Sequence, residues 1–432
     1  MKYYLAIDLG ATSGRHVIGY QENGEIVLKE IHRFKTEMDM STDGLVWNIP
    51  RIYNEILIGI RKAFEQYPVI ESLSIDTWGV DYVLMNGDKE IPPYYAYRNE
   101  RCEKAAKQLH ALIDFEELYK KTGIQYAAFN TLYQLFDDKQ KGRLEEATDY
   151  LMLPSYFTYR LTGVKTHEYT NESTGALLNA KSGEYDYELL NQLGLSRKLF
   201  GKIQQPGYVV GSLLPNIQME VGGNPRVVLC PSHDTASAFE SFDVPENGII
   251  LSSGTWSLLG IKSKQPIISE DSMKANYTNE GGVGYIRFLK NIMGMYIANR
   301  LRDETGLTFG EINNLINKSE YSKTFDINDP SLSAPTSMKE TVLKLLNDKP
   351  NDIDLFASVF HSMAVAYKAA IEELETITNK KYQSIYVIGG GAKNVYLNQL
   401  IEKYTNKKVI AMPIEATALG NIKIQMKVSK EL

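Results

Sequence analysis

Residues 5–15 read Leu-Ala-Ile-Asp-Leu-Gly-Ala-Thr-Ser-Gly-Arg, and this stretch decides how the first half of the chain folds. A short apolar strand runs directly into glycines and hydroxyl side chains, and a second apolar stretch follows at residues 17–20. Two apolar runs around a short glycine-containing loop are typical of a hairpin. The sequence therefore predicts a hairpin whose tip is made of small residues.

The same pattern returns in the second half of the chain. Residues 249–257 read Ile-Ile-Leu-Ser-Ser-Gly-Thr-Trp-Ser, and another apolar stretch follows at 258–261. Small residues let backbone N–H groups approach an anion closely, and hydroxyls add further donors. One such loop fits neither the Walker A spacing nor GxGxxG, so an ordinary turn would remain the simpler explanation. Two loops at the heads of two halves predict a clamp around a polyphosphate.

Length and composition limit the possible classes of protein. A chain of 432 residues is long enough for two domains, and its 43% apolar and 23% charged residues are those of a globular protein. The net charge of −6 argues against nucleic acid or an anionic membrane as the main partner. We see neither a secretory leader pattern nor an apolar run long enough to span a bilayer. Cys102 and Cys230 are far apart, so we expect reduced cysteines in a cytoplasmic protein.

Regular patterns divide the chain into two α/β halves. In the first half, Ile52, Ile56, Ile60 and Phe64 recur at every fourth position, which predicts a helix. Turn chemistry at 243–248 suggests the boundary, with an N-terminal domain at 1–244 and a C-terminal domain at 245–432. The expected strands are 3–9, 15–20, 25–31, 72–76, 82–85, 226–230, 384–388 and 408–412, and the expected helices are 51–66, 353–376, 393–404 and one from about 415.

Asp234 is the best candidate for a general base. It follows a predicted strand, precedes the small residues of a short helix, and is flanked by His233. A base must reach the sugar hydroxyl that attacks a γ-phosphate. The alternative is an ordinary helix N-cap, for which Asp is a preferred residue. His233 is either a ligand of a sugar hydroxyl or a satisfied buried imidazole.

Two further features suit a nucleotide. Asp8, at the end of a strand beside the first loop, can hold the hydration shell of Mg²⁺ or cap the turn. Arg15 can neutralise phosphate charge or merely solvate a strand edge. Residues 389–391, three glycines between a strand and a helix, can admit the flat face of a nucleoside or form a tight turn.

Residues 76–81 read Asp-Thr-Trp-Gly-Val-Asp, with two carboxylates and an indole around one glycine. Polar groups beside an aromatic face suit a sugar pocket. The alternative is a turn with Trp78 packed in the core. Residues 97–101, Tyr-Arg-Asn-Glu-Arg, are either a polar pocket wall or a surface ion-pair patch.

Together, these motifs resemble the FGGY carbohydrate kinases, and most closely the members that act on L-rhamnulose. The resemblance extends over nearly the whole chain, and HDTASA with SSGTWS is its most specific part. The segments that carry it are residues 8–15, DTWGVDYVL (76–84), HDTASA (233–238), LSSGTWSLLG (251–260), LKNIMGM (289–295), GGGAKNVYLNQL (389–400) and EATALGN (415–421).

The resemblance implies an α/β protein of two actin-like, ribonuclease H-like ATPase domains with a cleft between them. It implies ATP with Mg²⁺ as cofactor, and Asp234 as the base for the C1 hydroxyl of L-rhamnulose. Alternatives are another ketose, such as L-fuculose or a related hydroxyketone, or a nucleotide-dependent sensor without catalysis. The implied ATP-binding residues are Ala11, Thr12, Ser13, Gly14, Arg15, Thr255, Asn299 and Gly390; the implied sugar-binding residues are Gly79, His233, Asp234, Thr235 and Asn291; and Asp8 is the implied metal holder.

The chain departs from the family pattern in two places. Asn299 stands where Gln is typical. The chain also stops soon after residues 415–421, where family members commonly continue. We therefore expect a shortened last helix to weaken packing behind the adenosine site.

Overall fold

The structure, a computed structural model, describes residues 1–333, 335–412 and 415–432. These residues divide into two compact units. The predicted domain boundary at 244/245 stays a prediction. The contacts within the chain add that two later segments belong to the first unit. The first unit comprises Met1–Phe242, Lys262–Phe288 and Thr417–Leu432, and the second comprises Asp243–Ile261 and Leu289–Ala416.

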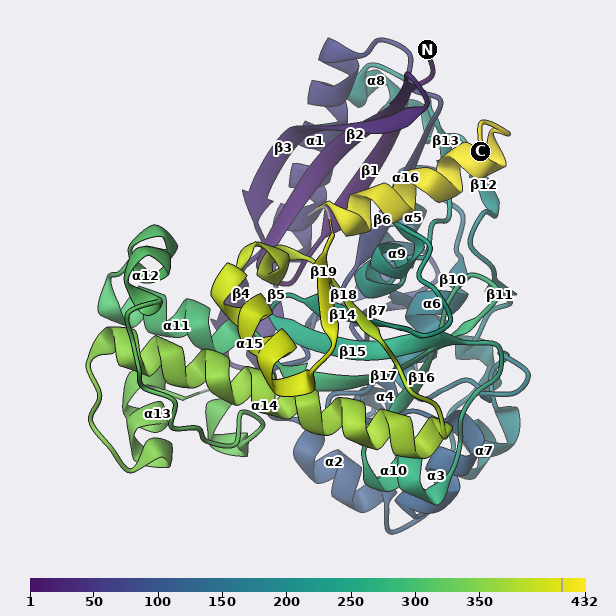
Figure 1. The fold of residues 1–432 in the computed structure, drawn as a ribbon. Helices are drawn as coiled ribbons and strands as arrows, with labels where there is room; N and C mark the ends of the chain where they lie inside the picture. Colours follow the sequence, from purple (N-terminus) through teal and green to yellow (C-terminus); the bar gives the residue numbers. More distant parts are fainter. Residues whose placement is uncertain (334, 413–414) are drawn as a thin grey trace. The chain divides into compact units, whose positions relative to one another are not determined.

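The main sheet of the first unit contains the predicted hairpin. Its strand order is β12-β13-β6-β1-β2-β3 (Figure 1). β1 pairs antiparallel with β2 and parallel with β6, so the sheet is mixed. The strands are β1 (Tyr4–Leu9), β2 (Ser13–Glu22), β3 (Glu25–Lys35), β6 (Ser72–Thr77), β12 (Val209–Gly211) and β13 (Arg226–Val228).

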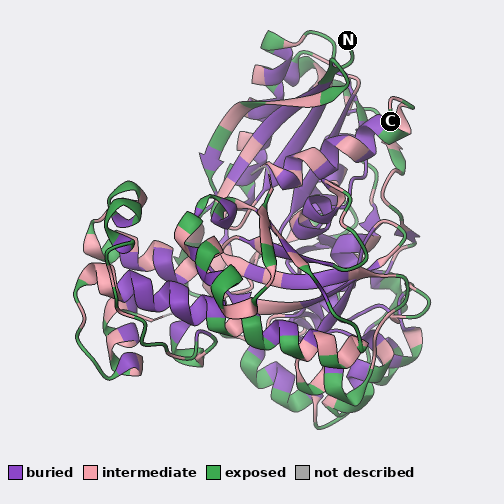
Figure 2. Cartoon of the chain, in the orientation of Figure 1, coloured by how far each residue is buried: buried purple, intermediate pink, exposed green. Residues whose placement is uncertain are grey.

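Helices from opposite ends of the first unit cover the two faces of this sheet. Side chains alternate between faces along a strand. Leu5 and Ile7 of β1 pack in the cluster that contains the buried side of α1 (Ile49–Gln66). Tyr4 and Ala6 pack instead with α16 (Ala416–Val428). The sheet lies between them and is mostly buried (Figure 2).

The last helix, α16, packs on the main sheet of the first unit. We expected it to support the adenosine site, yet α16 packs on the β1–β2 face of the first unit. Gly19 of β2 makes room for it, because a Cβ there would lie 2.6 Å from Cγ2 of Ile422. The expected effect on adenosine packing stays a prediction.

The rest of the first unit has its own apolar core, which is separate from that of the main sheet. It is built around a small sheet of order β8-β7-β9. Its elements include β7 (Tyr82–Asn86), β8 (Lys89–Ile91), β9 (Asp149–Met152), α2 (Cys102–Leu109), α3 (Phe115–Thr122), α4 (Thr131–Gln140), α6 (Tyr169–Glu172) and α7 (Tyr187–Gln192). The unit also holds α5 (Leu153–Thr162), which packs in the core of the main sheet, and α8 (Pro215–Val221), α9 (Asp234–Glu240), α10 (Glu270–Lys274) and β16 (Thr278–Gly281).

The second unit repeats the strand order of the first. Its sheet follows the order β16-β17-β15-β14-β18-β19, with β14 antiparallel to β15 and parallel to β18. In both sheets the first strand in sequence lies between its antiparallel neighbour, which is the second, and a parallel strand that follows later in the chain. The strands are β14 (Gly248–Ser253), β15 (Trp256–Ser263), β17 (Ile286–Met293), β18 (Ser384–Ile388) and β19 (Lys408–Ala411), of which β15 and β17 extend into segments of the first unit.

Helices complete the second unit (Figure 1). The longest is α14 (Asp352–Thr378), which contains the helix predicted at 353–376 and whose apolar stripe is buried. The others are α11 (Tyr296–Thr305), α12 (Phe309–Ile316), α13 (Met338–Leu346) and α15 (Val395–Thr405).

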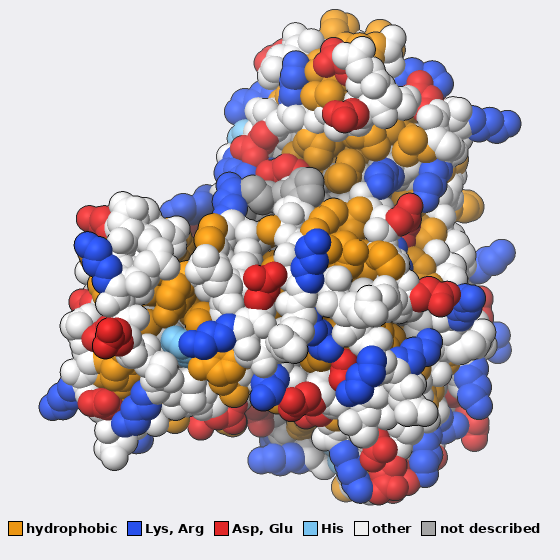
Figure 3. Space-filling model, in the orientation of Figure 1, with side chains coloured by type: hydrophobic (Ala, Val, Ile, Leu, Met, Phe, Trp, Pro, Cys, Tyr) orange, Lys and Arg blue, Asp and Glu red, His pale blue; other side chains and the backbone are white. Residues whose placement is uncertain are grey.

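Two further observations concern partners. Among the described helices, none is long and apolar enough to cross a bilayer. On the face drawn in Figure 3, Lys and Arg side chains are interspersed with Asp and Glu and form no continuous basic stripe.

Candidate active site

The first glycine-hydroxyl loop joins β1 to β2 as a tight turn. The amide of Gly10 donates to Ser13 O at 3.0 Å, and the Thr36 hydroxyl holds Gly10 O at 2.6 Å. Gly14 has no room for a side chain, because a Cβ would lie 2.4 Å from the Phe34 ring. Ala11, between these anchors, is partly exposed. A fixed loop of small, exposed residues has the chemistry of an anion site.

Asp8 and Arg15 form an ion pair beside this loop. Nε and Nη2 of Arg15 lie 2.8 and 2.7 Å from Oδ2 of Asp8. The Arg15 side chain is only 15% exposed, so it does more than solvate a strand edge. The pair directs a guanidinium and a carboxylate to the root of the loop.

Asp76 extends this polar group onto the neighbouring strand. It pairs in register with Asp8, and its Oδ2 accepts a 2.6 Å hydrogen bond from Asn421 of α16. Its Oδ1 is buried and has no hydrogen-bond partner among the described residues. Burial, reinforced by the negative charge of Asp8, raises the pKa of Asp76.

These carboxylates can be tested against the implied Mg²⁺. In the described part of the chain, no group of three His, Cys, Asp or Glu side chains is arranged to hold an ion directly. Mg²⁺ usually keeps several of its waters and uses only one or two carboxylates. Asp8, with the unsatisfied Asp76 oxygen beside it, fits a hydrated ion of that kind.

Asp234 lies where the chain leaves β13 and enters α9. The amide of Thr77 donates to Ser232 O at 2.8 Å, which joins this turn to the end of β6. His233 takes the N-cap position, and Asp234 is the first helical residue. The N-cap alternative for Asp234 is therefore wrong.

The Asp234 carboxyl has the surroundings of a base. Its Oδ1 accepts from the amide and hydroxyl of Thr235 at 2.6 and 3.0 Å, and its side chain is still 29% exposed. Burial raises the pKa of Asp234, while the neighbouring His233 lowers it. A carboxyl whose pKa lies above its usual value is a stronger base once it is ionised.

A buried polar segment that we did not select from the sequence holds the turn before Asp234. The carboxylate of Glu168 accepts from the Ser232 amide at 3.0 Å, and the His233 amide donates to Thr170 Oγ1 at 3.2 Å. Asn171 Nδ2 donates to Ser232 O at 3.1 Å and to Trp78 O at 3.3 Å. The signal was a run of nine residues, 167–175, that is almost entirely polar.

The turn after β6 is strained. The amide of Asp81 donates to Gly79 O at 2.9 Å, so Val80 is the centre of a three-residue turn with φ at +68°. A β-branched residue rarely adopts that conformation, and such strain often marks functional sites. The Thr174 hydroxyl supports the turn by accepting a hydrogen bond from the Val80 amide at 3.1 Å. A Cβ on Gly79 would lie only 2.9 Å from the same Thr174 Oγ1, so Thr174 also leaves no room for a side chain at Gly79.

Trp78 corrects part of the sugar-pocket prediction. Its indole is buried, and the ring centroids of Trp78 and Trp47 lie 4.3 Å apart. The indole N–H of Trp78 donates to Asp81 Oδ2 at 2.9 Å. Trp47 donates to the same oxygen at 2.6 Å. The alternative of core packing is therefore right, and no indole face is open for a sugar ring at this position. Gly79, which is partly exposed, remains the candidate.

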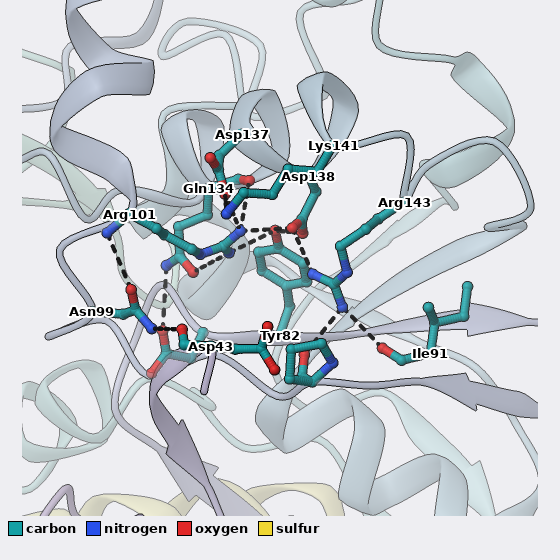
Figure 4. A network of polar contacts seen from close by, with 12 residues as sticks. Asp43, Tyr82, Ile91, Asn99, Arg101, Gln134, Asp137, Asp138, Lys141 and Arg143 are labelled. Atoms are coloured by element: carbon teal, nitrogen blue, oxygen red, sulfur yellow. Dashed lines mark hydrogen bonds and ion pairs between the residues drawn. The ribbon is translucent and has the colours of Figure 1, made fainter. Parts of the chain in front are cut away.

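Within residues 97–101, Arg101 is not part of a surface patch. The Arg101 side chain is only 5% exposed and lies 2.8 Å from Asp137 and 2.6 Å from Asp138 (Figure 4). Gln134 accepts from Arg101 at 3.1 Å and donates to Asp81 at 3.3 Å. Arg101 thus belongs to a buried network that supports the strained turn, not to a surface patch.

The second glycine-hydroxyl loop joins β14 to β15 in the second unit. The amide of Gly254 donates to Trp256 O at 2.9 Å, and Gly254 O accepts from Met295 at 2.9 Å. Gly294 packs directly on this turn, since a Cβ there would lie 2.8 Å from Gly254 O. Thr255, at the tip, is partly exposed.

The three glycines after β18 lie against the same loop. Gly389 has φ at +80°, and a Cβ on Gly391 would lie 2.0 Å from Oγ of Ser253. Gly390 differs from both: it is exposed, and a Cβ there would meet no atom within 4 Å. Backbone conformation and packing explain Gly389 and Gly391, whereas Gly390 has open space at its Cβ position.

Two predicted residues lie elsewhere in the second unit. Asn291 is on β17, and its Oδ1 is buried with no hydrogen-bond partner in the described structure. Asn299 is on α11 and is partly exposed. The predicted sites are thus distributed over both units: the first loop, Gly79 and residues 233–235 belong to the first, and Asn291, Thr255, Asn299 and Gly390 to the second.

Comparison with known sequences defines the class of protein. The pattern of the FGGY family of carbohydrate kinases, N-terminal domain, matches residues 3–239, and that of the C-terminal domain matches residues 249–428. The chain belongs to the FGGY family of carbohydrate kinases, so the resemblance inferred from its motifs is confirmed.

Individual relatives narrow the class. The chain is 40% identical to a rhamnulokinase from Oceanobacillus iheyensis, over 98% of this chain and 92% of the relative. It is 35% identical to a rhamnulokinase from Bacillus subtilis, over 99% of this chain and 91% of the relative.

Solved structures confirm the fold. A ligand-bound xylulose kinase from Lactobacillus acidophilus superposes with a TM-score of 0.84 at 18% identity, over 100% of this chain and 90% of that one. The structure of glycerol kinase from Plasmodium falciparum with ADP superposes with a TM-score of 0.79 at 14% identity, over 100% of this chain and 90% of that one. The predicted fold class, two actin-like α/β domains, is confirmed by these likenesses and by the repeated strand order.

Proposed function

We propose that this kinase transfers the γ-phosphate of ATP to the C1 hydroxyl of L-rhamnulose, giving L-rhamnulose 1-phosphate and ADP. The observation that carries the proposal is the Asp234 carboxyl, at the end of the turn after β13. This carboxyl is partly exposed, accepts a hydrogen bond from the Thr235 amide, and has a pKa raised by burial. The identity of 35–40% to rhamnulokinases over nearly the full chain supports the choice of sugar.

In the proposed mechanism, Asp234 accepts the proton of the C1 hydroxyl as that oxygen attacks the γ-phosphorus, and ADP leaves. Phosphoryl transfer requires mainly positioning and electrostatic stabilisation. Gly79, His233, Thr235 and Asn291 position the sugar. Donors from residues 11–15 and Thr255 stabilise the phosphates, and Gly390 leaves room for the nucleotide, with Asn299 as a further contact.

Mg²⁺ supplies neutralisation of charge on the β- and γ-phosphates when it is bound. Asp8 is the proposed holder, through the waters of the ion, and Arg15 keeps its carboxylate in place. The dependence on ATP, together with two free, buried cysteines, supports a protein of the cytoplasm.

The first test is a substrate panel. Purified protein with ATP and Mg²⁺ should consume ATP fastest with L-rhamnulose, and ³¹P NMR should place the phosphate on C1. Faster turnover with L-fuculose would transfer the assignment to that ketose. Binding of nucleotide and sugar without turnover would instead support a sensor.

The second test is Asp234→Asn, which keeps the shape of the side chain and removes the base. General-base catalysis contributes about 10²- to 10⁴-fold, so kcat should fall by about that factor while the Kd for L-rhamnulose changes little. Measuring kcat by coupled assay and Kd by calorimetry separates the two effects. An unchanged kcat would refute Asp234 as the base.

A further inference from the structure

The first unit buries an arginine beside the proposed base, and the motifs did not indicate it. Arg287, at the start of β17, is fully buried. Its Nε donates to Gly281 O at 2.7 Å, and its Nη2 lies 3.1 Å from Oε2 of Glu280 on β16. A buried charge is costly unless it is paired and hydrogen-bonded. Glu280 compensates it, and the guanidinium lowers the pKa of the Glu280 carboxyl against the effect of burial.

The same guanidinium contacts the His233 imidazole. Arg287 Nη2 lies 3.1 Å from Nδ1 of His233. A guanidinium only donates hydrogen bonds, so Nδ1 must accept this one. A neutral imidazole that accepts at Nδ1 carries its proton on Nε2. Arg287 therefore selects the Nε2–H tautomer.

Glu280 alone would select the opposite tautomer. Its Oε2 lies 3.3 Å from the same Nδ1 and would favour a proton there. The guanidinium resolves this competition, because its Nη2 is hydrogen-bonded to His233 Nδ1, whereas Oε2 of Glu280 has no hydrogen-bond partner among the described residues and pairs with Arg287 by charge. The tautomer of His233 thus depends on Arg287 remaining in place.

The other ring nitrogen faces the proposed base. His233 Nε2 lies 3.4 Å from Oδ1 of Asp234, the oxygen that Thr235 also holds. When Nε2 carries the proton, it directs a hydrogen-bond donor at the Asp234 carboxylate. This donor favours the ionised form of Asp234, which is the form that acts as a base. An unprotonated Nε2 would face it with a lone pair. The groups facing the ring are Asp234 from α9, Glu280 from β16 and Arg287 from β17.

We propose that Arg287 and Glu280 are positioning residues that hold His233 as its Nε2–H tautomer toward Asp234. The proposal rests on the proposed kinase function for its effect on rate. The tautomer itself is a property of the protein without substrate and can be measured independently. Arg287 and Glu280 act through His233.

The direct test is ¹⁵N NMR of the protein labelled at histidine, with His233→Gln to assign the signal. The wild type should show Nδ1 unprotonated and Nε2 protonated. Arg287→Met should move His233 to the Nδ1–H form, and Arg287→Lys, which retains a donor, should restore the Nε2–H form. A wild-type His233 with its proton on Nδ1 would overturn the proposal, and this measurement requires no variant beyond the assignment.

The kinetic test uses L-rhamnulose and ATP. Arg287→Met should lower kcat about tenfold to a hundredfold, with the KM for ATP within twofold, and Arg287→Lys should recover most of the loss. The matched control is Glu55→Gln, another carboxylate on a histidine, with Glu55 Oε2 2.7 Å from His32 Nε2 and no place in the segments around Asp234. It should lower thermal stability and leave kcat unchanged. A folded Arg287→Met with wild-type kcat would also overturn the proposal, whereas an inactive wild type with the Nε2–H tautomer would count only against the proposed function.

Discussion

Gly390 and Gly391 are adjacent in the chain but have different physical reasons to be glycine. Gly390 is exposed with open space at its Cβ position, whereas Gly391 lies against Ser253. Gly390→Leu should leave the thermal midpoint close to that of the wild type and raise the KM for ATP at least tenfold, because the side chain enters the proposed nucleotide site. Gly391→Ala should cost about 1–3 kcal/mol through overpacking.

Calorimetry and initial rates measure both effects, and the KM for sugar serves as the internal control for Gly390→Leu. An unchanged KM for ATP in that variant would remove the glycine stretch from the nucleotide site.

Asp81 gives the first unit a stability that depends on pH. Burial raises the pKa of Asp81 to about 6, although hydrogen bonds from Trp47 and Trp78 oppose this rise. Between about pH 4 and pH 6 the folded chain keeps a proton at Asp81 that the unfolded chain has lost. Stability from this group is therefore present below pH 4 and is lost as the pH rises through 6, by about 3 kcal/mol in total.

Asp81→Asn stays neutral and lacks this dependence. The thermal midpoint of the wild type minus that of the variant should therefore fall as the pH rises from 4.5 to 7.5. The subtraction cancels the other titrating groups. A difference that rises over this range would mean that Asp81 is ionised and stabilising in the folded chain.

Sequence reasoning selected the residues that stand at strand ends and missed those that act from a distance. Asp8 and Asp234 could be chosen because each follows an apolar strand, where parallel strands gather ligands. Glu280 and Arg287 could not, because an ordinary amphipathic strand also contains charged residues. Only the fold shows that both are buried and that they meet His233.

At the scale of elements, the contact between α16 and the β1–β2 hairpin is the least predictable from sequence. Helix and hairpin lie about 400 residues apart, and an apolar stripe does not specify which sheet it covers. The glycine at position 19 was a signal only in retrospect. The hairpin itself was predictable, because its turn chemistry is local.

This contact can be tested with a double-mutant cycle. Gly19→Ala places a methyl 2.6 Å from Ile422 and should cost about 1–3 kcal/mol, and Ile422→Ala should cost about 2–5 kcal/mol by leaving a cavity. The double variant should be more stable than the sum of the two losses implies, because the new methyl occupies space that the isoleucine vacates. Calorimetry of the four proteins measures the coupling, and strict additivity would contradict the packing.

At the scale of the whole molecule, the repeated strand order explains why two loops of the same kind occur. Each loop joins the central strand to its antiparallel neighbour, in the first unit after β1 and in the second after β14. The sequence predicted this repeat because both hairpins show it locally. It did not predict that residues 262–288 and 417–432 belong with the first unit, since such membership depends on contacts between distant segments.

The division of residues between units predicts which segments each ligand protects from hydrogen exchange. Residues 77–81 and 231–235 of the first unit carry Gly79 and the base, so L-rhamnulose alone should slow exchange there. ADP alone should slow exchange in residues 253–256 and 389–393 of the second unit, where Thr255 and Gly390 lie. Exchange followed by mass spectrometry separates these peptides, and α14, which is core, is the internal control. Protection by ADP that spares residues 389–393 would contradict the assignment of the nucleotide to the three glycines after β18, whatever the sugar does.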